Sequence, residues 1–414
     1  MSEPSVGGRL EGWVERLEQV PPLVGPDDTW TLWAVILGGT ALAIFLEQRY
    51  RWAARLSGPV VALVAAMLLS NFKVMPEKSP VYDVIGGYLV PVALPLLLFR
   101  ANLLRIVRTT GPMFLTFHVS TVGTLLGGFL AAFLFRSLLP KVPEITAMMN
   151  ASYIGGGVNF FAVRSALGVP EDLTSSLLVA DNFIMAGIFA LLVVISNTRW
   201  FLKRYPHPHS GEADAEANQR AAAAHWRPKE IALADIAKAM GIAVLIAAAS
   251  TRLAGAMKEH GPRSMLFDVV ADRYVLITFF SVLAATLFPR SMEAIRGSDE
   301  LGTYLLYIFF FAMGLPASLV AVVARVPLLF AFCLVIALVN LVLTLVVGRI
   351  FRIDLEDLLL CVNATLGGPA SAAAMSIAKG WPRLVLPALL VGIWGYVIGT
   401  ALGLFTYHLL AAWL

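Results

Sequence analysis

Long apolar runs separated by short polar stretches recur along the whole chain. They lie at about residues 30–47, 57–72, 83–99, 112–136, 144–166, 173–196, 231–253, 266–287, 301–322, 327–348, 355–377 and 384–412. Most are as long as a helix that crosses a hydrocarbon core of about 30 Å. Membrane strands would instead give short segments of alternating polarity, which the sequence lacks. The pattern predicts an all-α, polytopic bundle of membrane helices.

The apolar runs form two sets of six on either side of a polar stretch. We divide the chain into an N-terminal interfacial segment (1–28), a first transmembrane repeat (29–198), a polar cytoplasmic linker (199–229) and a second transmembrane repeat (230–414). Equal numbers of runs in the two halves indicate an internal duplication. Apolar residues at helical spacing from Leu10 to Val20 are typical of a helix on the membrane surface.

Each half contains one apolar run that is interrupted by glycine. Residues 150–157 read Asn-Ala-Ser-Tyr-Ile-Gly-Gly-Gly, and residues 363–369 read Asn-Ala-Thr-Leu-Gly-Gly-Pro. Two runs earlier, each half has a proline that we expect inside a span, Pro95 or Pro316. Helix breakers at corresponding places in two repeats indicate the binding site of a secondary transporter. We therefore predict a broken helix in each repeat.

The basic loops bear on the orientation of the repeats. The loops at 48–56 and 100–111, and the linker, are rich in Arg or Lys, which favours the cytoplasmic side for all three. Six complete crossings in the first half would put the linker outside. One element that fails to span, or one additional crossing, removes this conflict and makes the repeats inverted, which we favour. The basic loop at 254–273 argues for parallel repeats instead.

The residues around the two glycine motifs are candidates for binding. An unwound helix exposes carbonyls that can bind Na⁺ and half-helix N-termini that can hold an anion. We assign ion coupling to Asn150, Ser152 and Asn159, and substrate binding to Gly155, Gly156, Gly157, Asn363, Thr365, Gly367, Gly368 and Ser371. Close helix packing through small residues is the competing interpretation of either motif alone.

Asp181 is a further candidate, because it is a carboxylate inside the apolar run 173–196. At 1.5 Å per residue it lies about 14 Å from the start of its segment, close to the bilayer midplane. A carboxylate there costs roughly 2.5–3.5 kcal/mol and is functional by default. We predict that Asp181, with Asn182 beside it, binds Na⁺ or carries a proton. The alternative is a position near the membrane surface.

The last apolar run carries Gly395, Gly399 and Gly403 at a spacing of four residues. Such a ridge allows close helix contact, either within the chain or with a second copy in a homodimer. For two ionisable residues elsewhere, His118 and Arg164, the sequence predicts ordinary structural contacts or, for Arg164, a contact with substrate. His118 is expected to make an interhelical hydrogen bond. Arg164 either meets an anionic substrate or reaches to the membrane surface.

Composition narrows the function classes. The chain is 58% hydrophobic and 14% charged, with a mean hydropathy of +0.78, which leaves too few charges for a water-facing surface. The net charge of +4 fits basic cytoplasmic loops rather than nucleic-acid binding. The two cysteines cannot form a disulfide framework. Without a phosphate-binding loop, nucleophile elbow or HExxH motif, we expect neither an ATP-driven pump nor most membrane enzymes.

Several stretches resemble the YjcL-like family of integral membrane proteins of unknown function. They are Leu69-Ser70-Asn71, Pro95-Leu96-Leu97-Leu98-Phe99, residues 151–159, Ala180-Asp181-Asn182, residues 363–370 and Lys379-Gly380-Trp381. The resemblance runs from about residue 30 to the end and implies no substrate. The plan is also similar to sodium symporters and to cation/proton antiporters with crossed broken helices. In those antiporters acidic residues follow the first broken helix, which is the place of Asp181 here.

These features predict a multi-pass secondary transporter of the inner cell membrane. It would move a small solute, with an organic anion slightly favoured, coupled to Na⁺ or H⁺ by alternating access. A cation/proton antiporter without an organic substrate stays open, as does a membrane enzyme or a non-transporting scaffold. The expected partners are the lipid bilayer and the solute or ion. No cofactor is expected, apart from a Na⁺ ion at Asp181.

Overall fold

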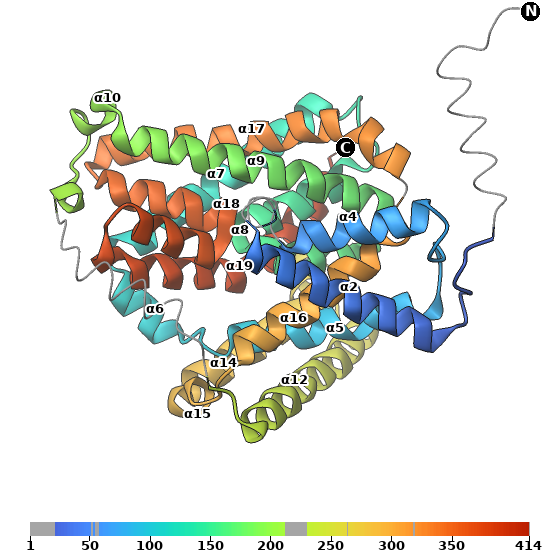
Figure 1. Cartoon of the computed structure of the whole chain (residues 1–414). Coiled ribbons are helices and arrows are strands. Elements are labelled where there is room, and N and C mark those ends of the chain that lie inside the picture. The colour runs from blue at the N-terminus through green and yellow to red at the C-terminus, as the bar shows by residue number, and fades with distance from the viewer. Residues whose placement is uncertain are drawn as a thin grey trace, which may run out of the picture. The chain divides into compact units, whose positions relative to one another are not determined.

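A computed structural model describes residues 21–50, 53, 58–211, 230–262, 264–317 and 319–413 (Figure 1). The surface helix predicted from Leu10 to Val20, and residues 212–229 of the predicted linker, lie outside these ranges. Every regular element in the described ranges is a helix. The predicted all-α, polytopic bundle is therefore confirmed. The inverted relation of the two halves stays a prediction.

Each of the twelve apolar runs falls on a helix. These are α2 (Thr29–Arg49), α4 (Gly58–Asn71), α5 (Pro80–Leu98), α7 (Pro112–Phe135), α8 (Val142–Leu167), α9 (Glu171–Asn197), α12 (Leu233–His260), α14 (Arg273–Leu287), α16 (Ser298–Gly314), α17 (Leu319–Phe351), α18 (Leu355–Ala378) and α19 (Val385–Ala411). Short helices between them are α6 (Leu103–Thr110), α10 (Arg199–Leu202), α13 (Met265–Val270), α15 (Pro289–Glu293), and the 3₁₀ turns η1 (Pro208–Gly211) and η2 (Pro382–Leu384). Among the described residues, eight helices are long and apolar enough to cross a membrane, whereas α4 and α14 are shorter.

The helices form two compact units, and each unit draws on both halves of the chain. The first comprises Met1–Leu89, Pro170–Asn182 and Leu305–Val326, so far as these residues are described. The second comprises Val90–Val169, Phe183–Tyr304 and Pro327–Leu414. Helices α5, α9, α16 and α17 contribute to both units.

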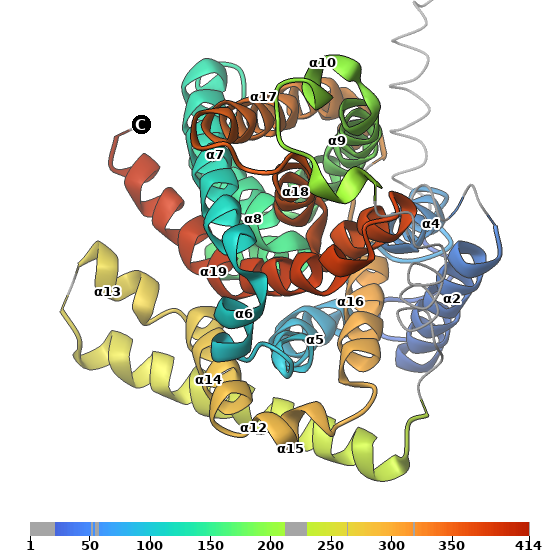
Figure 2. The ribbon, with the colours of Figure 1, turned by 90° about the vertical axis from the view of Figure 1, so that its left-hand side faces the viewer.

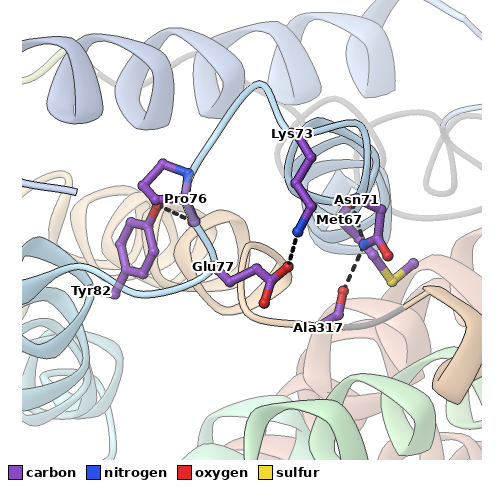
Figure 3. A network of polar contacts seen from close by, with 7 residues as sticks. All are labelled: Met67, Asn71, Lys73, Pro76, Glu77, Tyr82 and Ala317. Carbon is purple, nitrogen blue, oxygen red and sulfur yellow. Dashed lines mark hydrogen bonds and ion pairs between the residues drawn. The ribbon is translucent and has the colours of Figure 1, made fainter. Parts of the chain in front are cut away.

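A polar network holds the end of α4 in the first unit (Figure 3). The Asn71 amide donates to the carbonyls of Met67 (2.7 Å) and Ala317 (2.8 Å), and so ties α4 to the turn between α16 and α17. Beside it, Lys73 pairs with Glu77 at 2.6 Å. Asn71, in the stretch Leu69-Ser70-Asn71, therefore has a structural role, because its side chain connects two segments of the first unit.

One expectation about proline was wrong. Pro95 does lie inside α5, but α16 ends at Gly314, so Pro316 stands in the following turn. Proline has no N–H to continue the helical bonding pattern. The chain turns instead, and the Ala317 N–H donates to the Gly314 carbonyl at 3.2 Å.

A second polar contact between helices of the first unit is made by the Glu47 carboxylate. Glu47 of α2 accepts the Gly58 N–H at 2.7 Å and the Tyr307 hydroxyl at 2.5 Å. Because the first N–H groups of a helix lack partners within it, Glu47 acts as a cap for α4 from another helix. Glycine is needed at position 58, since a side chain there would meet both Glu47 and Tyr307.

In the second unit, α19 lies along both α8 and α18 (Figure 2). Helix α7 also contacts α8 and α18, and α12 packs on α14. Helices α8 and α18 carry the two glycine motifs, so α19 is positioned to touch both of them.

Candidate functional site

Helices α8 and α18 are each interrupted at one glycine, with the same backbone geometry. Gly156 has φ 69° and ψ −178°, and Gly368 has φ 79° and ψ −177°. This region of dihedral space is accessible almost only to glycine. Gly155, with φ −128° and ψ 16°, also departs from the helix. Both helices predicted to be broken are therefore broken, at matching glycines.

The two sequence motifs and the two breaks are out of step by one residue. Asn150 stands six residues before Gly156, whereas Asn363 stands five residues before Gly368. Aligning the breaks therefore does not align the Asn-Ala-Ser and Asn-Ala-Thr motifs. It pairs Asn159 with Ser371, each three residues after its break.

Side chains satisfy the carbonyls that the break in α8 leaves open. The Asn159 amide donates to the Gly155 carbonyl at 2.6 Å, and the Thr124 hydroxyl of α7 donates to the Tyr153 carbonyl at 3.3 Å. The Asn159 carbonyl oxygen accepts the Thr400 N–H of α19 at 3.1 Å and the Thr400 hydroxyl at 2.5 Å. Asn159 thus clamps the break and joins it to α19.

The break in α18 has a clamp of its own. The Asn363 amide donates to the Ser371 carbonyl at 3.0 Å, and the Ser371 hydroxyl donates to the Asn363 side-chain oxygen at 2.8 Å. These residues are eight apart, so the contact spans the interruption. Gly367 lies between them, and a Cβ there would be 2.9 Å from the Met185 methyl group of α9.

Asn150, Ser152, Gly157 and Thr365 also belong to the second unit, where Gly157 is exposed and the other three are buried. Asn150 and Ser152 precede the break in α8, with 0% and 3% of their surfaces exposed, and the Asn150 amide donates to Thr406 of α19 at 3.2 Å. Gly157 follows the break and is helical. Thr365 joins a buried polar network on α7 and α17, described next.

Asn340 of α17, which the sequence did not single out, is the centre of that network. Its amide donates to Thr124 (2.7 Å) and Thr365 (3.2 Å), and its oxygen accepts from Ser120 (2.9 Å). Asn340 is fully buried. Asn340 can approach α7 this closely because residue 123 is glycine; a Cβ there would be 2.9 Å from the Asn340 Cα. The network links α7, α17 and α18.

Tyr396 of α19 lies against both breaks. A Cβ on Gly156 would be 3.2 Å from its ring, and a Cβ on Gly368 would be 3.9 Å from its hydroxyl oxygen. No hydrogen bond to the Tyr396 hydroxyl occurs among the described residues. One phenol therefore bridges the two interruptions. The only sequence signal was a polar-tipped aromatic residue in mid-helix, next to the glycine ridge.

The glycine ridge of α19 packs within the chain. A Cβ on Gly399 would lie 3.0 Å from the Gly155 Cα, and one on Gly403 would lie 2.8 Å from the Ala151 Cβ. Gly395 faces the Ile154 carbonyl and Gly392 faces Pro369. The intrachain interpretation of the ridge therefore accounts for its spacing, which allows backbones to approach closely.

Comparison with known proteins places the chain in a family of undefined activity. Residues 34–413 match the family described as "Protein of unknown function (DUF819)". The chain belongs to the DUF819 family. A similar protein is the "Uncharacterized membrane protein YjcL" of Bacillus subtilis (strain 168), 43% identical over 384 residues, which cover 92% of this chain and 97% of the relative. The resemblance to YjcL-like membrane proteins is confirmed.

Asp181 and Asn182 of the DUF819 protein lie in the part of α9 that belongs to the first unit. Both side chains are half-buried, and the Asn182 amide donates to the Leu178 carbonyl of its own helix at 2.9 Å. The coupling role predicted for the pair stays a prediction. In the later part of α9, Met185 lies beside Gly367, as described above.

Basic residues near the breaks of the DUF819 protein serve the ends of helices. The Arg164 guanidinium donates to the Val169 carbonyl at 2.9 Å, just beyond the end of α8. Lys379 follows the last residue of α18 and donates to the Asn197 side chain at 2.7 Å. Burial lowers the pKa of the Lys379 ammonium group.

His118 makes the interhelical hydrogen bond expected of it. Its Nε2 accepts from the Trp394 indole N–H at 3.1 Å, and its Nδ1 bonds the Phe114 carbonyl at 2.7 Å. Because the indole can only donate, the neutral ring with a proton on Nδ1 satisfies both contacts.

Replacing Asn159 with alanine is expected to destabilise the DUF819 fold by roughly 1–3 kcal/mol, because buried polar partners would lose their hydrogen bonds. Thermal unfolding of the purified protein measures this loss. Asn197→Ala is the control, since both hydrogen bonds of its side chain, to the Val193 carbonyl and from the Lys379 ammonium group, are exposed to the surroundings. Equal unfolding temperatures for the Asn159 variant and the wild type would contradict the clamp.

Proposed function

We propose that this DUF819 protein is a secondary transporter that moves a small solute by alternating access, coupled to Na⁺ or H⁺. The observation that carries the proposal is the pair of identical glycine breaks in α8 and α18, both in contact with Tyr396. Paired broken helices of this kind are typical of secondary transporters.

Close packing alone does not require these breaks. Glycine within a continuous helix already allows a neighbour to approach closely. Here the backbone leaves the helical conformation at Gly156 and Gly368, which takes backbone groups out of the helical hydrogen-bond pattern. Amide and hydroxyl groups are also committed to the opened carbonyls, since unpaired backbone groups are not tolerated at membrane depth. Paired helix breaks whose backbone groups are satisfied in this way are characteristic of a transporter binding site.

The contacts narrow the groups that would recognise a solute. Asn159, Asn363 and Ser371 were candidates for direct binding, but their side chains bond within the chain. The Tyr396 hydroxyl and the backbone around the breaks are the groups that we assign to recognition. The half-helix after Gly156 presents N–H groups at its start, and the one after Gly368 does so from Ala370 onward because Pro369 has none; a small organic anion is therefore favoured.

Asp181 is our candidate for the coupling residue. It is a half-buried carboxylate in the middle of α9, a helix of 27 residues that qualifies as a membrane span. Its charge would be neutralised by the bound Na⁺ or proton in each transport cycle. The proposal places the protein in the inner cell membrane.

Replacing Asp181 with asparagine is expected to lower gradient-driven uptake by about tenfold or more, because the coupling charge is lost. The purified full chain is reconstituted in liposomes under a Na⁺ or pH gradient. Uptake of radiolabelled acetate, lactate, succinate, citrate and glutamate is followed, with an internal pH dye. Asp172→Asn, at the start of the same helix, is the matched control and should keep wild-type rates.

The outcomes separate the competing functions. Gradient-dependent uptake of at least one of these anions, lost in Asp181→Asn, supports the proposal. Na⁺-driven proton movement without uptake of any anion would instead identify a cation/proton antiporter. No flux of either kind from folded protein would overturn transport and favour an enzyme or a scaffold.

A further inference from the structure

Two consecutive carboxylates are buried at the start of α18. Glu356 is 1% exposed and Asp357 is 7% exposed. The chain around Tyr205 and Pro206 packs on this end of the helix. The Leu355 N–H donates to the Pro206 carbonyl at 2.8 Å, and the Tyr205 hydroxyl donates to the Leu345 carbonyl at 3.0 Å. The helix start is therefore covered by protein.

The Asp357 side chain makes no hydrogen bond or ion pair in the described parts of the chain. One of its carboxylate oxygens, Oδ1, is buried without a hydrogen-bond partner. The ion pairs Lys73–Glu77, Arg100–Asp299 and Arg105–Glu293 do not include it. The titratable groups that interact with it are Asp354, Glu356 and Cys361 on its own stretch and His209 on η1.

Helix capping does not explain this carboxylate. Asp235 holds the corresponding third position of α12, where it is half-exposed and accepts the Ala232 N–H at 3.1 Å. Asp357 makes no such bond in α18. The helix dipole favours an acidic group in the first turn only weakly. Burying an uncompensated charge costs far more, so the dipole is too weak to hold a bare carboxylate there.

We propose that Asp357 is a binding site for a monovalent cation, H⁺ or Na⁺, which neutralises the buried carboxylate. Asp354, Glu356 and Cys361 are neutral or negative. His209 can carry a positive charge, but it makes no hydrogen bond to the buried Oδ1, so the surroundings still favour a positive ligand there. A single positive charge suffices to balance Asp357. The inference goes beyond the proposed function, because it holds whether or not the protein transports a solute.

Thermal unfolding of the purified full chain in detergent tests the site. In choline chloride, wild-type protein is expected to unfold about 2–4 °C lower at high pH than near neutral pH, because deprotonation leaves a buried charge. If the ligand is Na⁺, adding NaCl at high pH restores the unfolding temperature. Asp357→Asn should lose this response, and Asp235→Asn should keep it.

Chemical labelling tests the Asp357 site in the wild-type protein, so that the test does not depend on whether Asp357→Asn folds. Dicyclohexylcarbodiimide reacts with protonated carboxyl groups in apolar surroundings; the carboxyl O–H adds across one C=N bond and no group leaves. Mass spectrometry is expected to find the adduct on Asp357, less of it at high pH, and less again with NaCl if Na⁺ binds. Loss of labelling with pH alone identifies H⁺ as the ligand.

Two results would overturn the inference. One is an Asp357 that stays unlabelled at every pH while Asp357→Asn keeps the wild-type response. The other is a response that disappears in Asp181→Asn and persists in Asp357→Asn, which would leave the proposed transport function intact. Conversely, a labelled, cation-protected Asp357 in protein without flux would support the site and refute transport.

Discussion

Replacing Gly368 with alanine is expected to destabilise the second unit by roughly 1–3 kcal/mol, because its dihedral angles are accessible almost only to glycine. Space is not the reason. A Cβ on Gly368 would have the Tyr396 hydroxyl oxygen as its nearest neighbour, at 3.9 Å. The variant therefore isolates backbone strain from steric overlap. Urea unfolding in detergent, followed by tryptophan fluorescence, measures the loss.

The companion variant Gly156→Ala would have the same unfavourable dihedral angles for alanine and, in addition, a tight contact between the new methyl group and Tyr396. Its Cβ would lie 3.2 Å from the Tyr396 ring, so we expect at least the loss seen for Gly368→Ala. Gly187→Ala is the control, because Gly187 is a helical residue of α9 with open space around it. There alanine should be neutral or stabilising by about 0.5–1 kcal/mol. A stable, fully folded Gly368→Ala protein would argue against a break at this residue.

Gly395→Ala is expected to give the other large effect. The added methyl group would overlap the Ile154 carbonyl of α8 and come within 3.0 Å of the Phe117 ring. A backbone carbonyl cannot rotate away as a side chain can, so α19 must move off α8. Overpacking of this kind costs typically 1–3 kcal/mol, occasionally more. Unfolding temperature and yield of monodisperse protein report it.

Gly241→Ala is the matched control for this variant. Gly241 lies in α12 with nothing near the position of its missing Cβ, so the same change should be harmless there. If Gly395→Ala unfolds like the wild type, the close contact between α19 and α8 is not what holds these helices together.

The sequence predicted the helices well, because apolar runs of bilayer length have few alternatives. It also indicated which two helices are broken. It could not identify the residue at which each breaks, since three successive glycines at 155–157 are equivalent in one dimension. The similarity of the two sequence motifs pairs Asn150 with Asn363. Superposing the two backbone breaks at Gly156 and Gly368 instead pairs Asn159 with Ser371.

The residues that were missed depend on contacts between distant segments. Asn340 and Tyr396 are single polar groups in long apolar helices, and only packing shows that each touches several partners. Glu356 and Asp357 look like a solvated helix start in the sequence. Their burial depends on the chain around Tyr205, about 150 residues earlier in the sequence.

The glycine contacts of α19 also limit how this part of the molecule can move. Because the glycines of α19 approach backbone atoms of Ile154, Gly155 and Pro369 closely, these contacts cannot relax by a change of side-chain rotamer. Asn159 and Thr400 lock the same pair of helices. A transport cycle would then have to move α8, α18 and α19 together as one rigid body. The glycines would be fixed points of contact between these helices and not hinges.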